Sequence, residues 1–200
     1  MPVRDWDDFY TSSSVTDLSW YEETPTTLID IAKLGLMPAE TTVLDVGGGA
    51  STLADHLVER GYEHVTVLDL ATTAASNTSQ DPRITRVAGD VRSHSCDEAV
   101  GLWHDRATFH FLTEPQERAA YKSVLAQCLK DGGSAVIATF APAGPTMCAG
   151  RDVDRYSEGE LVSEFAGTLD PVACRTHVPA DSDSDQRPYT ICRFTKPAAS

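Results

Sequence analysis

Short apolar runs alternate with amphipathic segments along most of the chain. The runs are five to seven residues long and rich in β-branched side chains, which is typical of strands buried on both faces of a parallel sheet. Five such strands are expected at residues 42–46, 65–70, 84–88, 99–104 and 134–140. The pattern therefore predicts a sheet that is parallel over most of its width.

Helical patterns separate and follow these strands. We expect helices at residues 26–36, 51–60, 71–78, 115–129 and 157–165, with Ser157 and Glu160 forming a capping box on the last of them. Lys130–Gly133 reads as a helix-ending turn, and residues 141–155 as a Pro/Gly-rich excursion without a period. Alternating strands and helices predict an α/β fold, doubly wound around the sheet.

Two more strands are expected near the end of the chain, at residues 172–178 and 189–195. The polar run Asp181–Asp185 joins them without a helix, which indicates an antiparallel hairpin at one edge of a seven-stranded sheet. No repeat or long linker divides the chain, so a single domain over 1–200 is predicted. Within it, 39–200 form the core, and the aromatic arm and helix of 1–38 act as a cap.

Composition narrows the class of partner. Thirty acidic and 16 basic residues give a net charge of −14, which disfavours nucleic acid and anionic membranes. No apolar stretch reaches the roughly 20 residues that cross a bilayer, and the acidic, aromatic start is unlike a secretory signal. The five cysteines are odd in number and widely separated. They predict reduced thiols in the cytoplasm, with neither a disulfide framework nor a metal site.

The first candidate site follows the first strand. Gly47-Gly48-Gly49 lets the backbone turn sharply, and the next helix points its N-terminal amides there. Asp69 ends the second strand, 22 residues after Gly47, and Asp90 follows the third. These carboxyl ends meet at one edge of the sheet, so Asp69 is placed for ribose hydroxyls and Asp90 for an adenine amine. The alternatives are a tight turn for the glycines and a turn or helix-cap role for either acid.

Two common nucleotide motifs do not fit. The dinucleotide fingerprint G-x-G-x-x-G would need glycine at Thr52 or Leu53, which disfavours a nicotinamide oxidoreductase. The phosphate-loop lysine is absent as well. Instead, Asp45 precedes the first glycine by two residues.

Asp45-Val46-Gly47-Gly48-Gly49-Ala50-Ser51 resembles the D-x-G-x-G-x-G loop of class I S-adenosylmethionine-dependent methyltransferases, with Ser51 in place of the last glycine. Val67–Leu70 and Gly89–Val91 resemble that family's ribose and adenine motifs, so the resemblance covers roughly residues 40–140. It implies a Rossmann-like fold, S-adenosylmethionine as cofactor and S-adenosylhomocysteine as product. The residues expected around the cofactor are Trp20, Asp45, Gly47, Gly49, Ser51, Asp69, Leu70, Gly89, Asp90 and Val91.

The acceptor stays open at this stage. Residues 102–112 resemble small bacterial methyltransferases of unassigned substrate and, distantly, the W-D-R segment of thiopurine methyltransferase-like enzymes. Ser19-Trp20-Tyr21 resembles a segment of methyltransferases related to protein-lysine modifiers. A small molecule methylated at O, N or S is the first hypothesis. A protein lysine and a non-catalytic cofactor-binding module are the alternatives, and the chain is expected to be a monomer or homodimer.

Methyl transfer from a sulfonium is an in-line displacement that needs a base only when the acceptor arrives protonated. His104 and Asp105 are the candidate bases because they end the fourth strand, and Arg106 could hold an anionic acceptor. The alternative is an Asp105–Arg106 pair that fixes the loop, with His104 bonded to backbone. The side chains expected around the acceptor are Tyr10, Tyr21, Phe109, Phe111, Cys148 and Arg151; core packing is the alternative for the phenylalanines.

Overall fold

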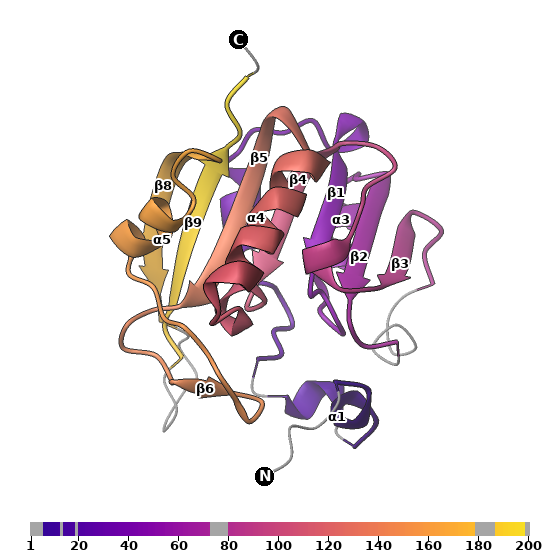
Figure 1. Ribbon diagram of the computed structural model, residues 1–200. Coiled ribbons are helices and arrows are strands. Elements are labelled where there is room, and N and C mark those ends of the chain that lie inside the picture. The colour runs from indigo at the N-terminus through magenta and orange to yellow at the C-terminus, as the bar shows by residue number, and fades with distance from the viewer. Residues whose placement is uncertain (1–5, 13, 19, 73–79, 179–186, 199–200) are drawn as a thin grey trace.

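A seven-stranded sheet forms the centre of the molecule in the computed structural model, which describes residues 6–12, 14–18, 20–72, 80–178 and 187–198 (Figure 1). Its order is β3-β2-β1-β4-β5-β9-β8. The strands are β1 (Thr42–Val46), β2 (His64–Asp69), β3 (Ile84–Ala88), β4 (Val100–Arg106), β5 (Leu129–Phe140), β8 (Asp170–His177) and β9 (Tyr189–Thr195). The first five are parallel, and β9 runs antiparallel to both β5 and β8. The predicted fold class and edge hairpin are confirmed.

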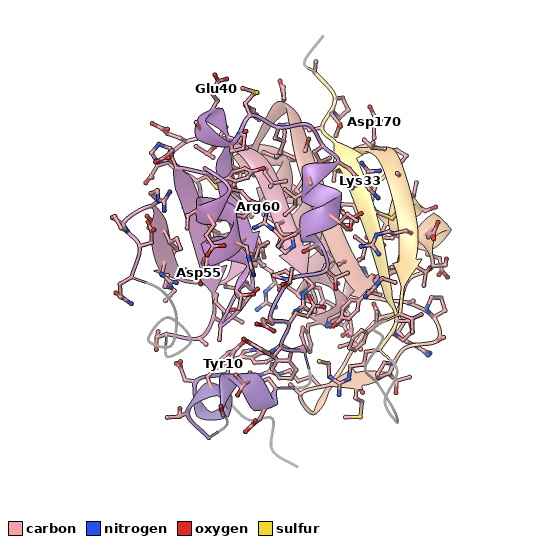
Figure 2. All side chains as sticks on the ribbon, turned by 180° about the vertical axis from the view of Figure 1, so that it is seen from behind. Tyr10, Lys33, Glu40, Asp55, Arg60 and Asp170 are labelled. Carbon is pink, nitrogen blue, oxygen red and sulfur yellow. A yellow bond between two sulfur atoms is a disulfide. The ribbon has the colours of Figure 1, made fainter. Side chains whose placement is uncertain are left out.

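Helices cover both faces of this sheet. On one face, α2 (Leu28–Ala32) and α3 (Leu53–Glu59) pack on a cluster of buried side chains from β1, β2, β4 and β5. On the other, α4 (Pro115–Cys128) and α5 (Glu158–Glu164) pack on a cluster that includes the fully buried Trp103 (Figures 1 and 2). Because side chains of a strand alternate between faces, β1 to β5 and β9 contribute to both clusters, whereas the edge strand β8 contributes only Cys174 to the second.

The last helix begins as predicted. The hydroxyl of Ser157 accepts a hydrogen bond from the Glu160 amide at 3.3 Å, and the Ser157 amide donates to the Glu160 carboxylate at 2.8 Å. This reciprocal capping box satisfies two amides that the first helical turn leaves without partners.

Several boundaries differ from the prediction. The helix expected at residues 26–36 is limited to α2, and the turn expected at 130–133 lies inside β5. Gly132 makes this possible with φ of +72°, and its amide donates to the carbonyl of Lys196. Most of the helix expected at 71–78 and the turn at 181–185 fall outside the described residues.

Two elements were not predicted. A short helix, α1 (Trp6–Ser12), lies in the N-terminal arm, beyond the carboxyl ends of the parallel strands (Figure 1). A small hairpin, β6 (Met147–Cys148) and β7 (Arg151–Asp152), lies in the excursion after β5. Neither has a long enough pattern to be recognised from periodicity, and both border the site described below.

The thiol prediction was wrong for four of the five cysteines. Disulfides join Cys96 to Cys128 and Cys174 to Cys192, while Cys148 is free and buried. The prediction took the wide separation of the cysteines in the sequence as evidence against disulfides. The fold nevertheless makes Cys174 and Cys192 register partners on neighbouring strands. Within the described part of the chain, no helix has both the length and the apolar character needed to span a membrane.

Candidate active site

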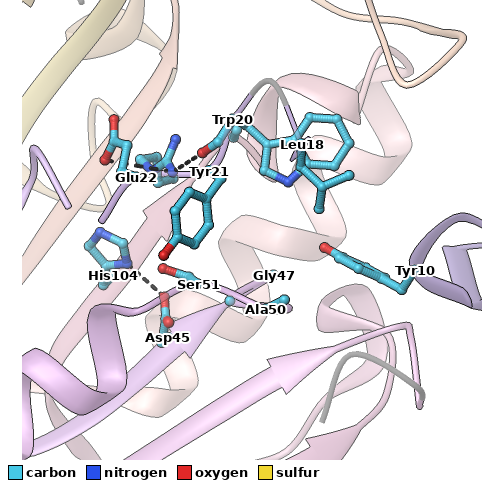
Figure 3. Close-up of a pocket in the computed structure, with 13 residues that line it drawn as sticks. Tyr10, Leu18, Trp20, Tyr21, Glu22, Asp45, Gly47, Ala50, Ser51 and His104 are labelled. Carbon is cyan, nitrogen blue, oxygen red and sulfur yellow. Dashed lines mark hydrogen bonds and ion pairs between the residues drawn. The ribbon is translucent and has the colours of Figure 1, made fainter. Parts of the chain in front are cut away.

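A cavity of about 580 Å³ crosses the carboxyl ends of the parallel strands, within the range typical of small-ligand sites. The loops after β1, β2, β3 and β4 line it, and α1 and the β6–β7 hairpin close its other side. A narrow hollow of about 50 Å³ adjoins it (Figure 3). The two share the lining residues Tyr10, Trp20, Gly47, Arg106 and Ala107, so we treat them as two parts of one cleft.

The glycine loop forms the floor where the two hollows meet. Gly47 and Gly49 have φ of +64° and +48°, the left-handed region that glycine adopts without strain. A Cβ on Gly47 would lie 1.7 Å from Thr108 Oγ1, and one on Gly49 would lie 2.4 Å from the Tyr10 hydroxyl. The loop therefore tolerates no side chain at these two positions while Thr108 and Tyr10 keep their places.

A buried carboxylate lies directly beneath this loop. His104 Nδ1 donates to Asp45 Oδ1 at 2.7 Å (Figure 3), and His104 Nε2 lies 2.9 Å from Thr27 Oγ1. Asp45 Oδ2 is buried and has no hydrogen-bond partner in the described ranges. Because a buried unpaired carboxylate oxygen is costly, Asp45 fits a ligand that brings a positive charge or an N–H donor to the narrow hollow.

The predicted nucleoside-binding residues come together on the wall of the larger cavity. Leu70, Gly89 and Val91 line it with the two acids. Asp69 Oδ1 accepts from the Ala71 amide at 2.8 Å, and burial raises the pKa of its carboxyl to about 6. This places a carboxylate in a poorly solvated position where a donor ligand would be most favourable.

Asp90 makes more hydrogen bonds within the protein than Asp69 does. Its Oδ1 accepts from the Arg92 amide and from Arg92 Nε, both at 2.9 Å, and this hydrogen bonding lowers the pKa of Asp90. Arg92 also pairs with Glu117 on α4. Asp90 thus lines the cavity as a charged group whose direction is set by a neighbouring guanidinium.

The end of β4 differs from the prediction, because adjacent residues of a strand point to opposite faces. Asp105 faces α4, is completely buried and lines neither hollow. It accepts from the Tyr121 hydroxyl at 2.7 Å and from the amides of Thr108 and Phe109 at 2.9 and 3.1 Å. The structure therefore does not bring Asp105 to the cavity as a base; its carboxylate fixes the loop that follows β4.

His104 faces the other side and borders the narrow hollow, with both ring nitrogens within hydrogen-bond distance of protein groups. His104 was predicted as a candidate base, with a backbone hydrogen bond as the alternative, whereas the structure gives its ring two side-chain partners. Arg106 borders both hollows; its Nη2 donates to the Trp20 carbonyl at 2.7 Å and lies 3.6 Å from Glu22. Arg106 therefore joins β4 to the N-terminal arm, and the described contacts include no Asp105–Arg106 pair.

The predicted acceptor residues divide into two groups. Phe109 is fully buried in the core and reaches neither hollow. Phe111, Cys148 and Arg151 line the larger cavity, Tyr21 lines the narrow one, and Tyr10 lines both. Of the cofactor residues, Ser51 lines the narrow hollow and Trp20 both, while Gly49 lies against Tyr10 and Asp69.

Some lining residues were not predicted. Ala107 has φ of +68°, a left-handed conformation that is uncommon for residues other than glycine. No sequence pattern predicted it. Thr108 Oγ1 donates to the Val46 carbonyl at 3.2 Å and closes the loop over Gly47. Trp6 lines the cavity, and its ring lies edge to face against that of Phe111. The number of aromatic residues in the N-terminal arm was the only sequence feature that pointed to Trp6.

Comparison with known proteins agrees with this geometry. Residues 43–133 match the family described as "Methyltransferase domain". No curated protein matches the sequence at a significant level.

Among solved structures, one from a study of the conversion of a disulfide bond into a thioacetal group during echinomycin biosynthesis is 22% identical, with a TM-score of 0.71 over 97% of this chain and 92% of that one. The 1,6-didemethyltoxoflavin-N1-methyltransferase of Burkholderia thailandensis, solved with bound 1,6-didemethyltoxoflavin and S-adenosylhomocysteine, is 23% identical, with a TM-score of 0.71 over 95% of this chain and 81% of that one. The N-methyltransferase NodS of Bradyrhizobium japonicum is 17% identical, with a TM-score of 0.65 over 88% and 90%.

At these identities the solved structures show a shared fold alone, and the family match adds the domain type. Together they confirm the family-level resemblance predicted from the glycine loop and the two acids. The match places a methyltransferase domain at residues 43–133, and the solved structures share the fold of S-adenosylmethionine-dependent methyltransferases.

Proposed function

We propose that the chain transfers a methyl group from S-adenosylmethionine to a small-molecule acceptor. The observation that carries this proposal is the cleft itself: a cavity of about 580 Å³ over the strand ends, bounded by the glycine loop and Asp69 at one side and by α1 and the β6–β7 hairpin at the other. An adenosyl group and a small acceptor fit a cavity of this size.

The residues that line the larger cavity fit the cofactor. Asp69 would accept from the ribose hydroxyls, with its carboxylate already turned toward the cavity by the Ala71 amide. Asp90, Leu70, Gly89 and Val91 would surround the adenine. A purine is flat and apolar on its faces and polar at its edge, so the mixture of aliphatic side chains and one carboxylate is suitable for it.

The narrow hollow fits the amino-acid end of the same molecule. Asp45 Oδ2 lacks a described partner and would accept from the cofactor's ammonium group, while Gly47 and Ser51 provide close backbone approach. Tyr10, Trp20 and Tyr21 present aromatic groups to the cleft, and aromatic faces attract a sulfonium. We therefore assign the N-terminal arm the role of a cap over the reacting end of the cofactor.

When bound, S-adenosylmethionine supplies an activated methyl group on a good leaving group. The protein's contribution is then to align the acceptor and to exclude water. His104 acts as a positioning residue that holds Asp45 through Nδ1 while Thr27 fixes its other nitrogen. Asp105 positions the loop 106–108 between the two hollows.

One of the solved structures holds a small acceptor: the Burkholderia enzyme is named as the 1,6-didemethyltoxoflavin-N1-methyltransferase and was solved with 1,6-didemethyltoxoflavin bound. It supports a small acceptor by analogy of fold. A cytoplasmic location stays a prediction, and its argument from reduced thiols no longer holds because four cysteines are paired.

The test is transfer of labelled methyl from S-adenosylmethionine into cell extract, separated into small-molecule and protein fractions. We expect label in the small-molecule fraction, and none with the Gly47→Ala variant. Label confined to protein would replace this proposal with a protein-lysine methyltransferase. Binding of S-adenosylhomocysteine without transfer to either fraction, across extracts from several growth conditions, would favour a non-catalytic module.

A further inference from the structure

A buried line of polar side chains runs from the glycine loop to the helix α2. Its members are Asp45, His104 and Thr27, each at most 3% exposed and each within 2.9 Å of the next. The line ends under the loop, because a Cβ on Gly48 would lie 2.4 Å from Asp45 Oδ2. The proposed function places the cofactor's ammonium group at that oxygen, so the groups behind Asp45 decide what charge it presents there.

The hydrogens along this line follow from the chemistry of its two ends. An ionised carboxylate only accepts, so the hydrogen between Asp45 and His104 is on Nδ1. In the part of the chain that the structure describes, the Thr27 hydroxyl has one hydrogen-bonding neighbour, His104 Nε2. A charged ring would donate from both nitrogens and leave the buried hydroxyl hydrogen without an acceptor, which is costly. Thr27 therefore donates to Nε2, and His104 is neutral with its hydrogen on Nδ1.

This arrangement leaves the narrow hollow with one uncompensated negative charge. A cationic His104 would neutralise Asp45, whereas a neutral ring only donates a hydrogen bond to it. The other two charged side chains that border the hollow, Glu22 and Arg106, lie 3.6 Å apart and compensate each other. A cationic group is therefore favoured over a neutral one at Asp45 Oδ2.

The helix that carries Thr27 at its start is fastened to the edge hairpin. A helix of five residues has little stability of its own, and Figure 2 shows α2, with Lys33 just beyond its end, beside the yellow strands β8 and β9. The buried carboxylate of Asp30 accepts from Arg175 of β8, at 2.6 Å from Nη2 and 3.1 Å from Nε. Arg175 Nη2 also lies 3.3 Å from the Thr26 carbonyl. One guanidinium thus holds the helix and the residue before Thr27.

We propose that Thr27 is a positioning residue for the cofactor and that, with α2 held by Asp30 and Arg175, it makes the narrow hollow specific for a ligand with an ammonium group. Thr27 keeps His104 neutral, and His104 holds Asp45, which presents its charge to the ammonium. This rests on the proposed function and adds which part of the cofactor is selected. Thr27, Asp30 and Arg175 line neither hollow, so the selection depends on residues behind the cleft.

The test compares two ligands that differ in one group. S-adenosylhomocysteine carries the ammonium, and its deaminated analogue has hydrogen in that place but keeps the adenosine, the sulfur and the carboxylate. Calorimetry on the full chain should show that the native protein binds S-adenosylhomocysteine at least about tenfold more tightly than the analogue.

A variant of the hydroxyl tests the positioning role. Thr27→Val keeps the shape of the side chain and removes the donor. Its affinity for S-adenosylhomocysteine should fall about tenfold, and its affinity for the analogue should change by less than about twofold. Thr27→Ser should restore most of the loss. Thr139→Val is the matched control, because Thr139 is also fully buried, lines neither hollow, and has a hydroxyl with no hydrogen-bond partner in the described ranges.

A second variant tests the support of α2. Arg175→Lys keeps the charge and loses the planar fork that reaches two groups. We expect its affinity for S-adenosylhomocysteine to fall about twofold to fivefold and its affinity for the analogue to stay unchanged. Arg60→Lys is the control, since Arg60 is exposed at the end of α3 and bonds the carbonyl of His56.

Nitrogen NMR of the imidazole rings provides a signal that a merely structural role would not move. In the native chain at neutral pH, the His104 signals, identified by their loss in His104→Gln, should be those of a neutral ring with its hydrogen on Nδ1. Thr27→Val should increase the share of the protonated ring, and Thr139→Val should not.

Four results would overturn the proposal. They are equal binding of the two ligands by the native chain, equal losses for both ligands in Thr27→Val, no loss for either ligand in that variant, and a native His104 that carries hydrogen on Nε2. Failure of both ligands to bind the native chain would instead sink the proposed function. The NMR spectrum needs no ligand, so it tests the role of Thr27 in that case too.

Discussion

The two ends of the cleft meet at Gly47, but the chain builds them by different means. The nucleoside end uses residues at or just beyond the carboxyl ends of β1, β2 and β3, so the strands themselves place Gly47, Asp69 and Asp90. The acceptor end is assembled from α1, the loop after β4 and the β6–β7 hairpin, which are far apart in sequence. A site made from strand ends can be found from spacing, whereas one made from separate loops needs the folded structure.

The largest loss of cofactor affinity is expected from a side chain at Gly47, which lines both hollows of the cleft. Gly47→Ala places a Cβ 1.7 Å from Thr108 Oγ1 at φ of +64°. Overpacking and left-handed strain together cost about 2–5 kcal/mol. We expect calorimetry to detect no binding of S-adenosylhomocysteine.

Gly167→Ala is its control, because Gly167 has φ of +82° and no atoms within 4 Å of an added Cβ. It should lose about 1–2 kcal/mol of stability to the same backbone strain and keep its affinity. Equal affinities in the two variants would show that the glycine loop is not part of the binding site.

A smaller loss is expected at the nucleoside end. Asp69→Ala removes charge-assisted hydrogen bonds worth about 1.5–3 kcal/mol, so the Kd for S-adenosylhomocysteine should rise about 10–150-fold. Asp55→Ala on α3 should leave it unchanged. If the Asp69 variant bound as tightly as the native chain, the ribose assignment would be wrong.

The pH dependence sharpens this prediction. Burial raises the pKa of Asp69 to about 6, so lowering the pH below that value protonates the carboxyl and should weaken binding. The same group affects folding in the opposite direction: because its folded pKa exceeds the ordinary value of 3.8, its contribution to stability increases as pH falls from about 6 to about 4. Asp69→Asn should abolish the change in affinity, and an affinity that rises on acidification would contradict the account.

Asp105, predicted from the sequence as one of two candidate bases, lies behind the cleft and is expected to act on stability. Asp105→Asn turns an N–H group toward the amides of Thr108 or Phe109 and should cost about 1–3 kcal/mol of unfolding free energy. Tyr121→Phe should cost less, and Asp97→Asn, at an exposed position, nothing. If Asp105→Asn kept full stability but lost turnover together with the acidic limb of the rate profile, Asp105 would be a base after all.

The smallest effect on the cleft is expected from the β8–β9 disulfide. Replacing Cys174 and Cys192 with alanine should lower stability by about 2–4 kcal/mol. Neither residue lines a hollow, so the affinity for S-adenosylhomocysteine should change by less than about twofold. A large loss of affinity in the double variant would mean that the disulfide itself supports the site.

The sequence predicted the sheet, its edge hairpin and the residues of the nucleoside end, because β-branched runs and acids at strand ends are local patterns. It also singled out Phe111, Cys148 and Arg151, which line the larger cavity. It did not separate His104 from Asp105, although alternation along a strand already implies that only one of them can face a given side. Ala107 in the left-handed region and the pairing of four cysteines depend on tertiary contacts that no local pattern contains.

The central claim is that an adenosyl group occupies the strand ends with its amino-acid end against the glycine loop. Calorimetric titration of the native chain with S-adenosylhomocysteine, and separately with NAD, tests it most directly. We predict equimolar binding of S-adenosylhomocysteine and no binding of NAD. Binding of NAD alone, or of neither molecule, would contradict the claim.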